Sequence, residues 1–163
     1  MMKNPSSESI LRGIALLCLA GVGVALVSQY VFDMQPCAWC VLQRLILLAV
    51  AAVCGLATAG WRSARIHALG AALAAILSAC GIAAAWYQYT VAAHLFSCDQ
   101  TFADKFIASS GLDAALPWLF GIYATCMDAR VSVLGIEYAL WALALFAVCL
   151  ALAAWALRRA RRG

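Results

Sequence analysis

The chain of 163 residues is two-thirds hydrophobic and only 11% charged, a composition that excludes an ordinary soluble domain. Its net charge of +4 comes from basic residues beside long apolar stretches, not from a continuous basic surface, so we expect no nucleic-acid partner. The sequence predicts a single all-α membrane domain over residues 1–163.

Four stretches are long enough to cross about 30 Å of hydrocarbon, which takes roughly 20 helical residues. They cover residues 13–32, 41–61, 66–87 and 138–157, and Arg44 is the one formal charge within them. The first stretch is long for a signal peptide and lacks a convincing cleavage site, so we expect it to remain as a membrane helix. The sequence therefore predicts an integral membrane four-helix bundle with external loops at about 33–40 and 88–137.

Most basic residues flank one side of these helices. Eight of the eleven do so, namely Lys3, Arg12, Arg62, Arg65, Arg158, Arg159, Arg161 and Arg162. Cytoplasmic segments of membrane proteins are enriched in Lys and Arg. We therefore expect a multi-pass protein with both termini in the cytoplasm and both longer loops on the outer face.

The long second outer loop is rich in aromatic residues, which argues against disorder. Residues 114–127 are uncharged but too short to span a bilayer. Within them, Pro117–Phe120 is typical of a short interfacial helix lying at the membrane surface. The alternative is that these aromatic side chains only pack the loop against the bundle.

The eight cysteines divide evenly between the bundle and the outer loops. Cysteine packs well as a small hydrophobic residue, and this role suits the four within the spanning stretches, Cys18, Cys54, Cys80 and Cys149. The other four are Cys37, Cys40, Cys98 and Cys126. In an oxidising compartment, an even set of outer cysteines indicates disulfides. The spacing favours a Cys37–Cys40 pair, and their shared loop favours a Cys98–Cys126 pair.

The Cys37–Cys40 pair has the spacing of an exchangeable disulfide. Pro36 precedes it and an apolar helix follows, so both thiols lie at a helix N-terminus, where the helix dipole favours the thiolate. A bridge that closes so small a loop stabilises little, which favours a redox role. Two adjacent pairs would form a relay. The alternative is a metal-binding or carrier protein that uses the four outer thiols for zinc or copper, although the sequence has one C-x-x-C and no histidine cluster.

Arg44 lies four residues after Cys40 and is followed by apolar residues. Inserting an arginine near the centre of a membrane helix costs about 2.5–3.5 kcal/mol, so such residues usually have a function. Its side chain could instead extend to the lipid head groups. Beside Cys40, it would stabilise a thiolate or an anionic oxygen of a bound cofactor. The sequence has no flavin or nicotinamide motif, so the expected electron acceptor is a lipid-soluble quinone.

At these residues the chain resembles the DsbB family of bacterial inner-membrane proteins, the quinone-linked oxidases of the periplasmic thiol oxidant DsbA. The matching features are four helices, Pro36-Cys37-x-x-Cys40 with Arg44, Cys98-Asp99, and Cys126 followed by Leu134-Gly135-Ile136-Glu137. The resemblance implies a protein-dithiol:quinone oxidoreductase whose partners are a DsbA-like protein, the quinone pool and the lipid bilayer. The implied acceptor is ubiquinone, or menaquinone without oxygen.

The resemblance also implies a role for each site residue. The Cys98–Cys126 pair would take electrons from DsbA, with Cys98 attacked by the partner, and would pass them to Cys37–Cys40. Cys40 would then act on the quinone near Arg44. Some family members have a histidine where this chain has Tyr89, so no histidine role carries over. The vitamin K epoxide reductase family is also similar, but its C-x-x-C follows its loop cysteines, which reverses the order found here.

Overall fold

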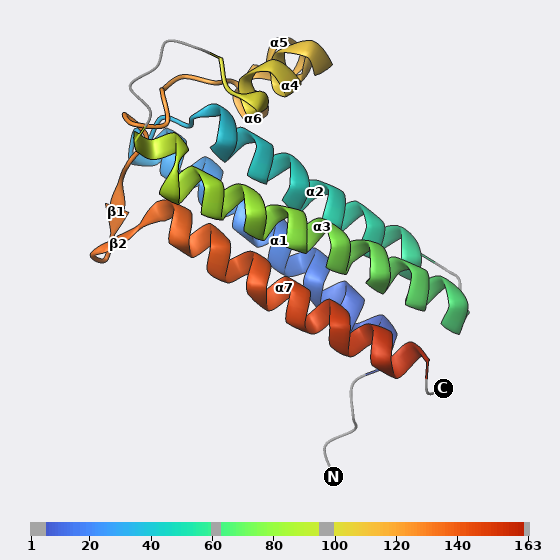
Figure 1. Cartoon of the computed structure of the whole chain (residues 1–163). Coiled ribbons are helices and arrows are strands. Elements are labelled where there is room, and N and C mark those ends of the chain that lie inside the picture. The colour runs from blue at the N-terminus through green and yellow to red at the C-terminus, as the bar shows by residue number, and fades with distance from the viewer. Residues whose placement is uncertain (1–5, 60–62, 95–99, 162–163) are drawn as a thin grey trace.

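The computed structural model describes residues 6–59, 63–94 and 100–161 and consists mainly of four long helices packed side by side (Figure 1). They are α1 (Ser7–Val31), α2 (Ala38–Thr58), α3 (Ala64–Thr90) and α7 (Tyr138–Ala160). All four are long and apolar enough to cross a membrane. The predicted all-α four-helix membrane bundle is confirmed.

The helices begin at local signals that hydropathy alone does not reveal. α1 begins six residues before the expected position 13, because the Ser6 hydroxyl accepts a hydrogen bond from the backbone N–H of Ser9 and caps the helix. α2 begins at Ala38 with Cys37 as its N-cap residue, so Cys40 lies in its first turn. The helix ends at Thr58, before the expected residue 61, with Ala59 as its C-cap residue.

Small residues let the helices approach closely. Gly81 of α3 lies directly against the ring of Phe146 on α7, and a Cβ atom at this glycine would overlap the ring. Gly70 of α3 meets Ala57 of α2 in the same way. Such small side chains are typical of membrane helix interfaces, where association depends on close packing rather than on expulsion of water.

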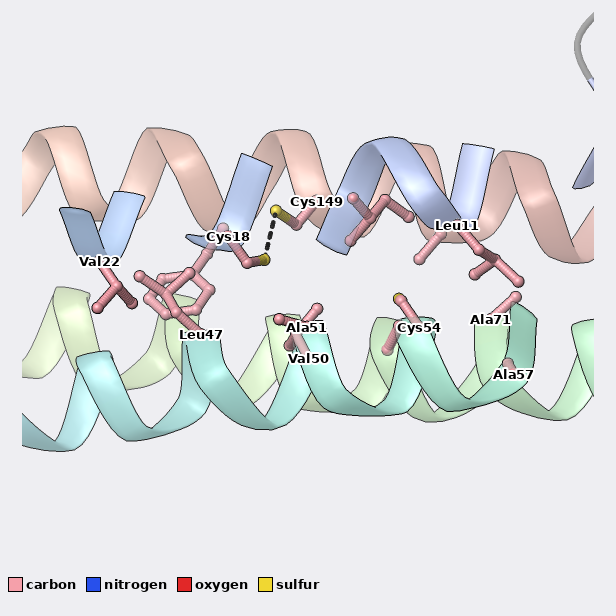
Figure 2. Close-up of a cluster of buried hydrophobic side chains, with 14 of the residues drawn as sticks. Leu11, Cys18, Val22, Leu47, Val50, Ala51, Cys54, Ala57, Ala71 and Cys149 are labelled. Atoms are coloured by element: carbon pink, nitrogen blue, oxygen red, sulfur yellow. Dashed lines mark hydrogen bonds between the residues drawn. The ribbon is translucent and has the colours of Figure 1, made fainter. Parts of the chain in front are cut away.

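The interior of the bundle is apolar and contains three of the four expected packing cysteines. Figure 2 shows Cys18 of α1 facing Cys149 of α7, with their Sγ atoms 3.7 Å apart. Cys54 of α2 is also fully buried, whereas Cys80 of α3 is exposed on the surface of the bundle. Leu11, Val50 and neighbouring side chains fill the space around them.

The segment between α3 and α7 folds over one end of the bundle (Figure 1). Its helical pieces are η1 (Ala92–His94), α4 (Phe102–Ser110), α5 (Leu112–Ala115) and α6 (Pro117–Phe120). A two-stranded hairpin follows, made of β1 (Ser132–Val133) and β2 (Ile136–Glu137). Its turn places Leu134 and Gly135 at positive φ, 56° and 80°. The sequence did not predict this hairpin.

The short helix α6 is anchored to the bundle through its backbone. The Trp118 carbonyl accepts a hydrogen bond from the Tyr30 hydroxyl of α1 at 2.7 Å, and the Leu119 carbonyl accepts one from Arg44 of α2. Leu119 and Phe120 are buried, while Trp118 is half exposed. One face of the segment thus packs against the bundle and the other remains available to an interface.

Candidate thiol site and adjacent pocket

Three of the four outer cysteines meet at the N-terminus of α2. The Sγ atoms of Cys37 and Cys40 are 3.0 Å apart. Cys126, which comes from the segment before the hairpin, packs against the cluster that contains Cys37. Its thiol is within hydrogen-bonding reach of the Cys37 thiol. Cys98 lies outside the described residues. The fold therefore places Cys37 between Cys40 and Cys126.

Backbone contacts hold Cys126 in this place. The Pro36 carbonyl, immediately before Cys37, accepts hydrogen bonds from the N–H groups of Tyr123 at 3.0 Å and Ala124 at 3.3 Å. The next residue, Thr125, exchanges hydrogen bonds with Asp128 and closes a turn around Cys126. These hydrogen bonds join the two outer loops at Pro36, one residue before Cys37, and at Ala124, two residues before Cys126.

The two thiols at this junction differ in acidity. Cys37 is fully buried, and its hydrogen bonds to Cys126 and Cys40 together with this burial raise its pKa well above the ordinary value. The same hydrogen bond from Cys37 lowers the pKa of Cys126. Of these two thiols, therefore, Cys37 holds its proton more strongly and Cys126 loses its proton more readily.

Arg44 points into the bundle and not toward its surface. Only 5% of the residue is exposed, and its guanidinium donates to Gln29 Oε1 at 2.7 Å and to the carbonyls of Leu119 and Ala25. Within the described part of the chain, its Nε has no hydrogen-bond partner and no carboxylate pairs with it. The site therefore contains a buried cation that can still interact with an anion or an acceptor oxygen.

Two buried amides complete the polar site, and the sequence analysis missed both. Gln88 of α3 donates from Nε2 to Cys40 Sγ at 3.2 Å, and Gln43 of α2 donates to Gln88 Oε1 at 2.6 Å. Gln43 follows Cys40 by three residues and so lies on the same helix face, a signal that could have been used. Gln88 stands within an aromatic run, and its neighbour Tyr89 packs near Trp86 instead of facing the thiols.

An apolar pocket of about 620 Å³ lies beside these groups. Most of its lining residues come from α1, α2 and α7, and Val133 and Leu134 of the hairpin also line it. Its polar lining includes the sulfur of Cys40 and the side chains of Arg44, Gln43 and Gln88. Pockets of this size with a few converging polar groups are typical of small-molecule sites.

Over residues 6–59, 63–94 and 100–161, no group of three or more His, Cys, Asp or Glu side chains is arranged to hold a metal ion. Cys37 instead contacts both Cys40 and Cys126. This arrangement suits exchange between neighbouring sulfurs.

Fold and site together define a multi-pass membrane protein with clustered thiols beside an apolar pocket. The model of the disulfide bond formation protein DsbB family matches residues 7–156, and the chain belongs to this family. It is 34% identical over 148 residues to disulfide bond formation protein B of Herminiimonas arsenicoxydans, covering 90% of this chain and 91% of that one. It is 31% identical to the protein of the same name from Pseudomonas syringae pv. tomato, and that alignment covers 99% of this chain and 94% of the relative.

Membership of this family makes the chain a disulfide-forming membrane oxidoreductase. A further relative, disulfide bond formation protein B 1 of Pseudomonas syringae pv. syringae, is 33% identical over 152 residues, which is 91% of this chain and 88% of that one. The family match, over residues 7–156, runs from the start of α1 into α7 and includes both outer loops.

Proposed function

We propose that this protein is a thiol:quinone oxidoreductase that reoxidises a periplasmic DsbA-type dithiol. The observation that carries the proposal is the contact of Cys37 with both Cys126 and Cys40, together with the pocket that Cys40 and Arg44 line. Electrons would enter at the outer loop and leave at the pocket. Family membership supports the disulfide chemistry, and the geometry supports the route.

The exchange steps balance if each attack releases one thiolate. The partner dithiol reduces the Cys98–Cys126 disulfide, and the partner becomes oxidised. The Cys126 thiolate then attacks Cys37 Sγ, which breaks the Cys37–Cys40 bond and releases Cys40 as a thiolate. Attack of Cys98 on Cys126 restores the loop disulfide and leaves two electrons on Cys37 and Cys40. The contact between Cys126 and Cys37 favours Cys126 as the nucleophile, which attacks as the thiolate that the partner releases when it reduces Cys98–Cys126.

The pocket residues suit a quinone. Its apolar walls match a hydrophobic ring and tail, while quinone carbonyl oxygens accept hydrogen bonds, and the unpartnered Nε of Arg44 is a buried donor that needs an acceptor. The quinone would supply a two-electron, two-proton acceptor that leaves as the quinol. We assign ubiquinone to this pocket, with menaquinone as the anaerobic acceptor. Arg44 would orient the carbonyl and stabilise negative charge on oxygen or sulfur.

We also propose that the protein lies in the bacterial inner membrane with both termini in the cytoplasm. At the end of the bundle where α1 begins and α7 ends, the described charges are mostly basic, including Arg12, Arg65 and Arg158 (Figure 1). The thiols lie at the opposite end, which would then face the periplasm. This orientation supports the proposed partner, because only that compartment retains disulfides.

The test is quinone reduction by purified protein in lipid nanodiscs, with a reduced DsbA-type protein as electron donor. One quinone should be reduced for each partner disulfide formed, and without quinone each protein should oxidise at most two partner dithiols, one for each of its own two disulfides. Cys40→Ala should abolish turnover, whereas the matched control Cys149→Ala, which alters a buried thiol far from the site, should retain it.

Two further measurements separate this proposal from its alternatives. A partner that lacks its resolving cysteine should be trapped as a mixed disulfide by Cys126→Ala and not by Cys98→Ala. The purified protein should contain two disulfides and negligible zinc or copper. Four free outer thiols with one equivalent of metal would overturn the redox assignment in favour of a metal carrier.

A further inference from the structure

We propose that Gln88 is a positioning residue for Cys40, held in orientation by Gln43, and that its amide stabilises the thiolate formed when the Cys37–Cys40 disulfide opens. The inference deepens the proposed function, because it explains how Cys40 is made a good leaving group. It concerns only the sulfur and its neighbours, so its test needs neither partner nor quinone.

The hydrogen-bond geometry comes first. Gln88 Nε2 lies 3.2 Å from Cys40 Sγ, a normal distance for a donor to sulfur, and reaches it across the interface between α3 and α2. The other end of the same amide accepts from Gln43 Nε2 at 2.6 Å. Because one donor faces one acceptor between the two glutamines, the Gln88 oxygen is occupied and its NH₂ group is left for the sulfur.

Burial makes this contact important. Gln43 is 5% exposed and Gln88 is 6% exposed, so neither amide can exchange its partner for bulk water. A thiolate in such surroundings is costly unless a donor meets it, and a hydrogen bond to a charged group is worth more than one to a neutral group. The two amides therefore form a network whose open donor faces the sulfur that must carry the charge.

Arg44 does not replace this donor. Its described hydrogen bonds go to Gln29 and to two backbone carbonyls. Among the described residues, the recorded partners of Cys40 Sγ are the Cys37 thiol and the Gln88 amide. When Cys37 forms a disulfide with Cys126, it has no thiol proton left to donate to Cys40. Gln88 is then the direct donor to Cys40, and Arg44 acts over a longer distance through its charge.

A neutral amide is also the right group for this position. A carboxylate at residue 88 has nearly the same shape, but when ionised it has no proton to donate and repels the thiolate. The pair Gln43–Gln88 supplies polarity without negative charge, in a pocket where Arg44 is the one formal charge among the described lining residues. Gln88→Glu is therefore a nearly isosteric test of donation, and Gln88→Leu removes the amide altogether.

The experiment measures iodoacetamide alkylation of Cys40 in the full chain carrying Cys37→Ala, kept reduced in nanodiscs, with the peptide containing residue 40 quantified by mass spectrometry. Rates are recorded from pH 5 to pH 10. We expect Gln88→Leu to slow alkylation at pH 7 about tenfold, the effect of losing one hydrogen bond to a charged group, and Gln88→Glu to slow it at least as much. The rate at the high-pH limit should be unchanged.

Gln43→Leu should slow alkylation at pH 7 less, about threefold. The Gln88 NH₂ group can still donate to Cys40, but the hydrogen bond from Gln43 that orients the Gln88 amide is lost. The matched control is Ser78→Ala, at a fully buried polar residue of α3 whose hydroxyl has no hydrogen-bond partner among the described residues, and it should leave the whole profile unchanged. A rate at pH 7 within twofold of the parent for Gln88→Leu would overturn the proposal. An equal loss at every pH would also overturn it, because it would reflect access to Cys40 and not thiolate stability. Neither result depends on whether quinone is the acceptor.

Discussion

At the scale of single residues, Arg44 is the least expected group in the molecule. The sequence left open whether its side chain extends to the lipid head groups, and the structure places it inside the bundle with hydrogen bonds to Gln29 and backbone carbonyls. Burying an arginine without a carboxylate is expensive, and its carbonyl and amide acceptors offset only part of that cost. The remaining cost would be recovered when an electron-rich ligand occupies the pocket.

We therefore expect Arg44→Ala to raise the quinone concentration needed for half-maximal turnover about tenfold, with the thiol content and helix content unchanged. Arg44→Lys should recover part of the loss, because it keeps the charge and loses the planar donor group. Steady-state kinetics with a soluble ubiquinone analogue measure both. The same quinone dependence in all three proteins would mean that Arg44 is only structural.

Cys126 carries a second prediction, which concerns pH. The hydrogen bond from Cys37 lowers the pKa of Cys126, so its thiolate is present at a lower pH than that of an ordinary thiol. In Cys37→Ala, the pKa should return toward the ordinary value. Alkylation of Cys126 should then be several-fold slower near pH 7 and equal to the parent above the ordinary thiol range, as measured by peptide mass spectrometry. Faster alkylation at pH 7 would contradict the assignment.

The sequence could predict part of this site because that part is local. Cys37, Cys40 and Arg44 occupy one helical segment, so spacing alone places them together. Gln88 lies 48 residues after Cys40, and its role depends on the packing of α3 against α2, which hydropathy does not encode. The contact of Cys126 with Cys37 depends on two backbone hydrogen bonds to Pro36, which have no side-chain signature.

At the scale of secondary structure, the long helices were predictable because each is a continuous apolar segment of membrane length. The hairpin was not, because strands of two residues are too short to show any alternation. It is specified instead by its turn, where Leu134 and Gly135 have positive φ, a conformation that glycine adopts without strain. The short helix α4 shows the opposite case, since Thr101 and Asp104 form a capping box visible in the sequence.

The interface between α3 and α7 gives a prediction at this scale. Gly81→Ala should destabilise the bundle by about 1–3 kcal/mol, because the added methyl group overlaps the ring of Phe146. Gly23→Ala in α1 is the matched control, since open space surrounds that position and alanine favours a helix by up to about 1 kcal/mol. Thermal unfolding in the same detergent compares them. Equal midpoints for the two variants would show that this interface is loosely packed.

At the scale of the whole molecule, the charges separate along the bundle axis. Arg65 and Arg158 lie at the end away from the thiols, whereas Asp104 and Asp128 lie in the segments that cover the thiol end. The hydrocarbon between the two ends allows no charged side chain to cross easily, so this separation would be fixed when the helices insert. The orientation proposed above follows from it.

Labelling of intact cells tests this orientation. In a background with the four outer cysteines replaced by alanine, Ser109→Cys should react with a membrane-impermeant maleimide added to the periplasm, and Arg65→Cys should react only after lysis. Both positions are exposed, so a difference reflects the side of the membrane and not burial. The reverse pattern would place the thiols in the cytoplasm and remove the proposed partner.

The pocket opens on the side of the bundle, so the ligand concentration that matters is the concentration in the lipid and not in the buffer. Val24, Phe32 and Leu134 line it and are 61%, 67% and 88% exposed, and Val24 belongs to the membrane-length helix α1. A ligand that arrives from this side is supplied by two-dimensional diffusion, so its effective concentration is molecules per lipid. Adding lipid at fixed protein and quinone should therefore slow turnover, while adding buffer should not. Disulfide formation outside the cell would then follow the surface density of oxidised carrier in the bilayer.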